Sequence, residues 1–140
     1  MTPGSVLFDT NFRFSDGTFG EKIIVLLNNG DNYPYIIAKT TSKPGRHLWT
    51  PWCQIKHRFP NFYLPQGCCH LNKHTWIQLG KYFEYDRSLL IQKHFDGTAN
   101  IQDILPHQIL IDLLNCALQS EDIEDDIEKE LQVTLAGLAS

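Results

Sequence analysis

Residues 22–27 read KIIVLL and residues 33–41 read YPYIIAKTT, with NNGDN between them at 28–32. The first run is continuously aliphatic and β-branched, which is typical of a buried strand. The second run is also strand-like, and its Pro34 stands at the start, where a strand tolerates proline. The Asn-Gly pair in the connecting segment favours the positive φ angles of tight turns. These pieces predict a β-hairpin at the centre of the fold.

Shorter runs continue this pattern on both sides of the hairpin. Residues 42–60 hold three prolines and a glycine and are expected to be mostly loop. From alternating, β-branched and aromatic residues we expect further short strands at 5–9, 12–14, 62–64, 75–79 and 89–95.

The last third of the chain predicts helices. Pro106 suits the first turn of a helix, where its missing N–H costs nothing. Apolar residues then recur with helical period from 109 to 118. Ser120 is expected to cap a second helix, with the acidic residues 121–124 favourable at its N-terminus. The predicted fold class is mainly β (β+α), a compact barrel or curled sheet closed by C-terminal helices.

Length and composition are those of one globular domain. The chain has 140 residues, of which 42% are hydrophobic. No apolar run approaches the roughly 18 residues of a membrane span, and the N-terminus lacks the pattern of a secretory signal. We therefore expect a cytoplasmic protein without membrane partners. In that compartment the four cysteines are expected to be free thiols.

Charge is distributed unevenly along the chain. Residues 121–130 hold seven carboxylates and one lysine, whereas residues 32–83 hold seven Lys and Arg, four His and no carboxylate. Such a basic segment is typical of a binding site for an anionic ligand. The acidic segment predicts a solvated helix face; a sharper hypothesis is that it shields the basic groove of its own or a neighbouring subunit.

Several segments, in this order, resemble the PemK/MazF family of toxin ribonucleases. They are PGSVL at 3–7, FSDG at 14–17, EKIIVLLN at 21–28, IIAKTTS at 36–42, WIQL at 76–79, and GT at 97–98 leading into the helix at Pro106. The resemblance divides the chain into a barrel domain with its closing helix at 1–118 and an acidic helix or tail at 119–140.

The resemblance implies an SH3-like barrel, usually a homodimer, that cleaves single-stranded RNA without a metal or other cofactor. It also implies a cognate antitoxin protein that blocks the groove. The family's usual Arg and Thr pair falls on Lys22 and Thr40. Lys22 is a departure, because lysine lacks the bidentate fork of arginine. We therefore expect weaker or differently arranged catalysis.

Metal-free RNA cleavage uses the ribose 2′-hydroxyl as nucleophile. It needs a proton acceptor, a proton donor and groups that stabilise charge on the phosphorane. Lys22 is expected to stabilise that charge and Thr40 to donate to a phosphate oxygen. His47 is our first choice for acid–base chemistry, with His57 in reserve, because histidine titrates near neutral pH.

A basic and aromatic stretch follows Thr40 and predicts contacts with RNA. Cations neutralise phosphates while aromatic faces stack on unpaired bases. Alternatively, the tryptophans pack the loop onto the sheet and the charges are merely solvated. The predicted RNA-binding residues are Lys39, Lys43, Arg46, Trp49, Trp52, Lys56, His57 and Arg58.

Three other hypotheses stand beside the ribonuclease. A zinc site could use Cys53 and His57 with residues 68–74 (CCHLNKH), but this spacing matches no common zinc finger, so no metal is predicted. A non-catalytic SH3-like module that binds nucleic acid or peptide is the alternative to the ribonuclease, and the Lys22 departure favours it. A regulatory subunit whose acidic tail docks a partner is a weaker third.

Overall fold

The predicted hairpin is the centre of the structure. The computed structural model describes residues 1–43, 45, 49, 52–55, 60–68 and 71–139. Strands β2 (Phe19–Leu26) and β3 (Tyr35–Thr41) pair antiparallel. The turn between them contains Gly30 at φ 72°, where an added Cβ would meet the Tyr35 ring at 2.8 Å. The Asn28 side chain closes the turn by accepting from the Ile36 N–H at 2.8 Å. The hairpin prediction is confirmed.

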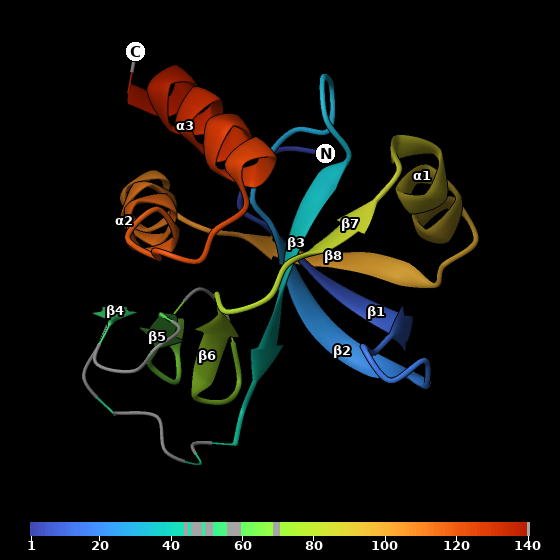
Figure 1. Cartoon of the computed structure of the whole chain (residues 1–140). Helices are drawn as coiled ribbons and strands as arrows, with labels where there is room; N and C mark the ends of the chain where they lie inside the picture. Colours follow the sequence, from blue (N-terminus) through green and yellow to red (C-terminus); the bar gives the residue numbers. More distant parts are fainter. Residues whose placement is uncertain (44, 46–48, 50–51, 56–59, 69–70, 140) are drawn as a thin grey trace.

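The remaining strands extend this hairpin into one antiparallel sheet, in the order β4-β5-β6-β3-β2-β1-β8, with β7 pairing to β3 off this path. In the described part of the chain no ladder joins β4 to β8, so the sheet curls without closing (Figure 1). The fold is therefore mixed β and α around an open sheet. The other strands are β1 (Ser5–Arg13), β4 (Trp52–Gln54), β5 (Asn61–Leu64), β6 (Thr75–Gln78), β7 (Phe83–Tyr85) and β8 (Ala99–Ile104).

The last three residues of strand β2, Ile24, Val25 and Leu26, are apolar because both faces of the strand are buried there. Val25 and Leu27, which follows the strand, belong to one hydrophobic cluster, which helices α2 (His107–Ala117) and α3 (Asp125–Ala139) cover. Ile24 and Leu26 belong to a second cluster under helix α1 (Arg87–Phe95). The helices thus lie on opposite sides of the sheet (Figure 1). Among the described residues, no helix is long and apolar enough to cross a membrane.

The predicted strand at 89–95 is wrong, because this segment is helix α1. Leu90 is buried, and Lys93, one helical turn later, reaches the buried carboxylate of Asp9 at 2.9 Å. A spacing of three places both side chains on one helix face, whereas a strand would place them on opposite faces. The helix after Pro106 is confirmed, and the next one begins at Asp125 rather than directly after Ser120.

The expectation of free thiols is also wrong for two of the cysteines. Cys53 in β4 and Cys116 in α2 form a disulfide, with their Cα atoms 5.5 Å apart. Sequence spacing gave no sign of this pair, since 63 residues separate the two positions. The bond ties the edge of the sheet to the helix that covers it.

Candidate functional site

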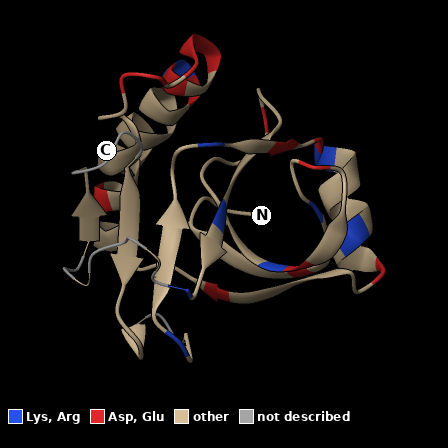
Figure 2. Cartoon of the chain, turned by 60° about the horizontal axis from the view of Figure 1, so that its bottom comes forward, with Lys and Arg blue, Asp and Glu red and all other residues tan. Residues whose placement is uncertain are grey.

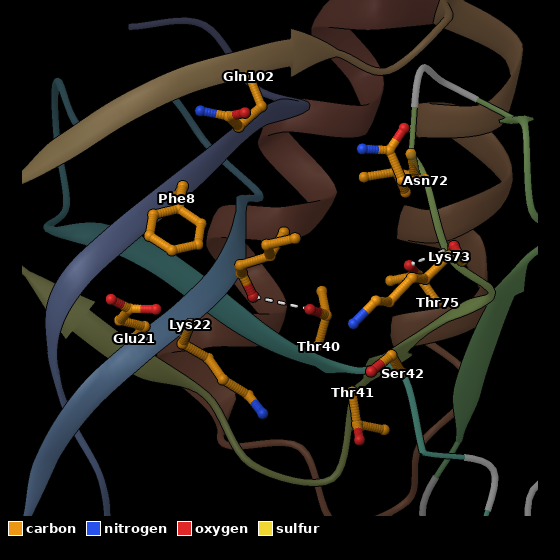
Figure 3. A pocket seen from close by; sticks show the side chains of 12 residues that line it. Phe8, Glu21, Lys22, Thr40, Thr41, Ser42, Asn72, Lys73, Thr75 and Gln102 are labelled. Carbon is orange, nitrogen blue, oxygen red and sulfur yellow. Dashed lines mark hydrogen bonds between the residues drawn. The ribbon is translucent and has the colours of Figure 1, made fainter.

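A cleft opens where β2, β3 and the segment before β6 meet. Its volume is about 460 Å³. Figure 3 shows the side chains that point into it from these elements. Ile23 and Leu71 contribute apolar surface, and the other lining groups are mostly ammonium, hydroxyl and amide groups. The cleft is lined by Phe8, Glu21, Lys22, Ile23, Thr40, Thr41, Ser42, Leu71, Asn72, Lys73, Thr75 and Gln102.

Lys22 and Thr40, the pair indicated by the family resemblance, line this same cleft. Lys22 is half-buried, and its ammonium nitrogen lies 6.0 Å from the centroid of the Phe14 ring. Burial lowers the pKa of Lys22, and the positive charges of Lys39 and Lys43 lower it further. A bound anion would relieve this repulsion, so the electrostatics favour a negatively charged ligand.

Thr40 is held differently from what the sequence predicts. It is buried, and its hydroxyl donates to the backbone carbonyl of Ile23 at 2.8 Å. A hydroxyl has one hydrogen to donate, so Thr40 cannot also donate to a phosphate while this bond persists. Its bond joins β3 to β2 beside Lys22. The predicted donor role therefore does not fit this geometry, and a role in positioning does.

Thr41 is better arranged for that donor role. Its Oγ1 accepts the Lys43 N–H at 3.2 Å, which leaves its own hydrogen available to a ligand. Ser42 follows on the same rim of the cleft. Both residues belong to the Thr-Thr-Ser run that the sequence singled out, and Thr41 comes one position after the predicted donor.

Lys73 is a cleft residue that the predicted RNA-binding set lacks. It comes from the loop before β6 and extends into the cleft from the wall opposite Lys22 (Figure 3). The signal for it was present, because Lys73 belongs to the carboxylate-free segment 32–83. Glu21, also missed, supplies the cleft's one carboxylate among the described lining residues.

The basic and aromatic stretch is described only in part, and Arg46, His47, Lys56, His57 and Arg58 lie outside the described residues. Trp49 packs edge-on against Trp76, with ring centroids 5.0 Å apart, and is still 54% exposed. Trp52 is 39% exposed at a φ of 73°, a left-handed conformation that a bulky residue rarely adopts. Both tryptophans thus pack on the sheet while presenting ring surface to solvent.

The structure bears on the zinc site considered from the sequence. The disulfide occupies the Cys53 sulfur, which removes it from the zinc hypothesis. No cluster of three His, Cys, Asp or Glu capable of holding a metal is found within the described ranges.

Helix α3 lies at the far end of β2 from the cleft. Its Glu130 accepts from the side chain of Asn28 at 2.7 Å, six residues beyond Lys22, or about 20 Å along a strand. Figure 2 shows the acidic residues of α3, in red, at one end of the molecule. The acidic helix therefore does not cover the cleft of its own chain.

No protein-family model matches this chain, and a search of curated proteins also finds no match.

Proposed function

We propose that this cleft binds single-stranded RNA and that the chain is a metal-independent endoribonuclease of the toxin type that its sequence resembles. The observation that carries the proposal is the meeting of Lys22 and Thr40 on one cleft together with Lys73. Two ammonium groups on opposite walls suit a phosphodiester, and the neighbouring hydroxyls suit its oxygens.

The chemistry assigned to the cleft is attack of a ribose 2′-hydroxyl on the adjacent phosphorus, which forms a 2′,3′-cyclic phosphate as the bond from phosphorus to the 5′-oxygen of the next nucleotide breaks. The hydroxyl gives up its proton, and the leaving 5′-oxygen takes up a proton from water or from an acid. Lys22 and Lys73 would stabilise the charge that gathers on the phosphorane oxygens. Thr41 would donate to one of these oxygens while Thr40 holds β2 and β3 in place. Glu21 is the cleft's candidate proton acceptor, and the role of His47 stays a prediction.

The same proposal includes the wider properties that the resemblance implies. They are an SH3-like barrel architecture, a homodimer, a protein antitoxin as partner, and a cytoplasmic location. The Cys53–Cys116 disulfide weighs against the last of these, because cytosolic thiols are usually kept reduced.

A non-catalytic binding module is the second candidate, and one observation favours it. The hydroxyl of Thr40 is engaged with the Ile23 carbonyl, and a lysine stands where the family places an arginine. Such a site retains the cations that hold a phosphate while lacking part of the catalytic arrangement.

Cleavage of a long single-stranded RNA in the presence of EDTA separates the two candidates. We expect discrete cuts by the wild type, loss of cutting in Lys22→Ala, and normal cutting in Lys81→Ala. Lys81 is a matched control because it is exposed and its ammonium lies over the Phe83 ring, outside the cleft. RNA that is bound but never cut would exclude the ribonuclease and leave the binding module.

A further inference from the structure

The cleft has two chemically different halves. Lys22, Lys73 and the Thr41 hydroxyl occupy one half in Figure 3. The other half is lined by the ring of Phe8 and by the side-chain amides of Gln102 and Asn72. These three groups carry no charge, so this half offers an aromatic surface and hydrogen-bonding groups without attracting a phosphate.

Gln102 reaches the cleft because of an irregularity in the sheet. In the β1–β8 ladder Leu7 lies opposite Ile101 and Val6 lies opposite Asp103, so Gln102 is the extra residue of a β-bulge. A bulge re-aims the side chain of its extra residue, and bulges are frequent beside active sites. In the described part of the chain no hydrogen bond engages the Gln102 amide, which leaves its donors and acceptor available to a ligand.

Asn72 faces the same space from the opposite wall. It precedes Lys73 in the loop before β6, and its side-chain amide likewise makes no hydrogen bond within the described residues. One short segment thus supplies an amide to the uncharged half and an ammonium to the charged half.

Phe8 adds an aromatic surface next to Gln102. It lies in β1 opposite Ile23 of β2 and is only half-buried, although most side chains of its strand interior are buried. A half-exposed phenyl ring beside free amides is the combination by which proteins hold an unpaired base, through stacking and through hydrogen bonds to its edge.

We infer that the half of the cleft lined by Phe8, Gln102 and Asn72 is a nucleobase pocket for the nucleotide whose phosphate lies between Lys22 and Lys73. This inference rests on the proposed binding of RNA and adds how a base is selected. An amide can pair with a base edge that presents a donor beside an acceptor. The volume of about 460 Å³ is in the range of small-ligand pockets, so the site takes one extruded nucleotide rather than a duplex.

The test uses five-residue 2′-O-methyl RNA probes, which lack the nucleophilic hydroxyl and cannot be cut. One probe is abasic at every position, and four others carry a single central A, C, G or U. Fluorescence anisotropy of labelled probes gives the dissociation constants. We expect at least one base to strengthen binding about tenfold over the abasic probe, as one well-made amide pair would.

The variants assign that gain to the pocket. We expect Gln102→Ala to reduce the tenfold preference to less than about twofold and Asn72→Ala to reduce it in part. Lys73→Ala should weaken the abasic and the base-bearing probes equally. Gln108→Ala is the matched control, because the Gln108 amide lies on α2 and bonds to Asp112. Thermal melts identify any variant that fails to fold, and Gln102→Asn then provides the conservative replacement.

Equal affinity of the wild type for abasic and base-bearing probes would overturn the base pocket and leave RNA binding intact. A loss of preference in Gln108→Ala as large as in Gln102→Ala would overturn it as well. Absence of binding to every probe would overturn the proposed function itself, and the pocket with it.

Discussion

Two lysines, Lys93 and Lys22, occupy opposite electrostatic situations in this chain. Lys93 donates to the Asp9 carboxylate and to the Asn11 carbonyl, each at 2.9 Å. Asp9 is fully buried and also accepts from the Tyr85 hydroxyl at 2.6 Å. Lys22, by contrast, is lowered in pKa by its burial and by two other lysines. The ammonium group of Lys93 is therefore neutralised within the protein, whereas a bound anion would stabilise the ammonium group of Lys22.

The cluster at Lys93 explains how α1 is attached to the sheet. Replacing Lys93 by Met keeps the stem but leaves the Asp9 carboxylate buried without its cation, so we expect a loss of about 3–5 kcal/mol in unfolding free energy. Urea denaturation measures it. The double variant Asp9→Asn/Lys93→Met should recover much of the loss. A single-variant loss below about 1 kcal/mol would refute the structural role of this pair.

The Cys53–Cys116 disulfide should stabilise the attachment of the sheet edge at β4 to helix α2. Cys53→Ser/Cys116→Ala removes a link across 63 residues of sequence, and we expect a loss of about 2–4 kcal/mol. Reducing the disulfide of the wild type with dithiothreitol should lower its unfolding free energy by a similar amount. If neither treatment changes the unfolding midpoint, the two cysteines are not bonded in solution.

If the charged half of the cleft binds RNA, its lysines should contribute to the salt dependence of the binding constant. Lys22→Ala and Lys73→Ala should each weaken binding of a single-stranded oligonucleotide about tenfold and reduce the slope of log K against log salt by about 0.7. Lys81→Ala is again the control. Unchanged slopes in both variants would mean that RNA does not contact this cleft.

Lys22→Met makes the same replacement as Lys93→Met, but its effect on the unfolding free energy should have the opposite sign. A lysine whose folded-state pKa is lowered costs stability while it is protonated, and this cost disappears as pH rises past its ordinary value of 10.5. Lys22→Met should therefore stabilise the ligand-free chain at pH 7, by less than about 1 kcal/mol because the site is partly solvated. The gain should vanish near pH 11 in denaturation curves; destabilisation at pH 7 would contradict this account.

Long, strongly patterned elements were predictable from the sequence. In the hairpin and in the helix after Pro106, most of the apolar positions in the sequence are positions that the structure buries. The short strands β5 and β6 were also predicted, from their aromatic and β-branched residues. Strands β4, β7 and β8 bury one residue each, so the sequence carries no burial pattern there and tertiary pairing defines them. Helix α1 was mistaken for a strand because only Leu90 of its residues is buried.

The candidate site was predictable to the same extent. Lys22 and Thr40 came from the family resemblance, and both line the cleft. Lys73 belongs to the carboxylate-free segment 32–83, but the sequence does not show that its loop meets β2 at a cleft. Gln102 gave no signal, because a β-bulge brings it there. The bond from the Thr40 hydroxyl to the Ile23 carbonyl, on which our proposal of Thr41 as the donor rests, likewise depends on strand pairing that the sequence does not state.

The most direct test of the central claim is an NMR titration of the lysine side chains in protein labelled with ¹³C at the lysine Cε positions. The pKa of each lysine would be measured with and without a short 2′-O-methyl RNA. We predict that the RNA raises the pKa of Lys22 and leaves that of Lys93 unchanged, because of these two lysines Lys22 alone lines the cleft and gains a new anionic neighbour. An unchanged pKa at Lys22 under saturating RNA would contradict the assignment of this cleft as the binding site.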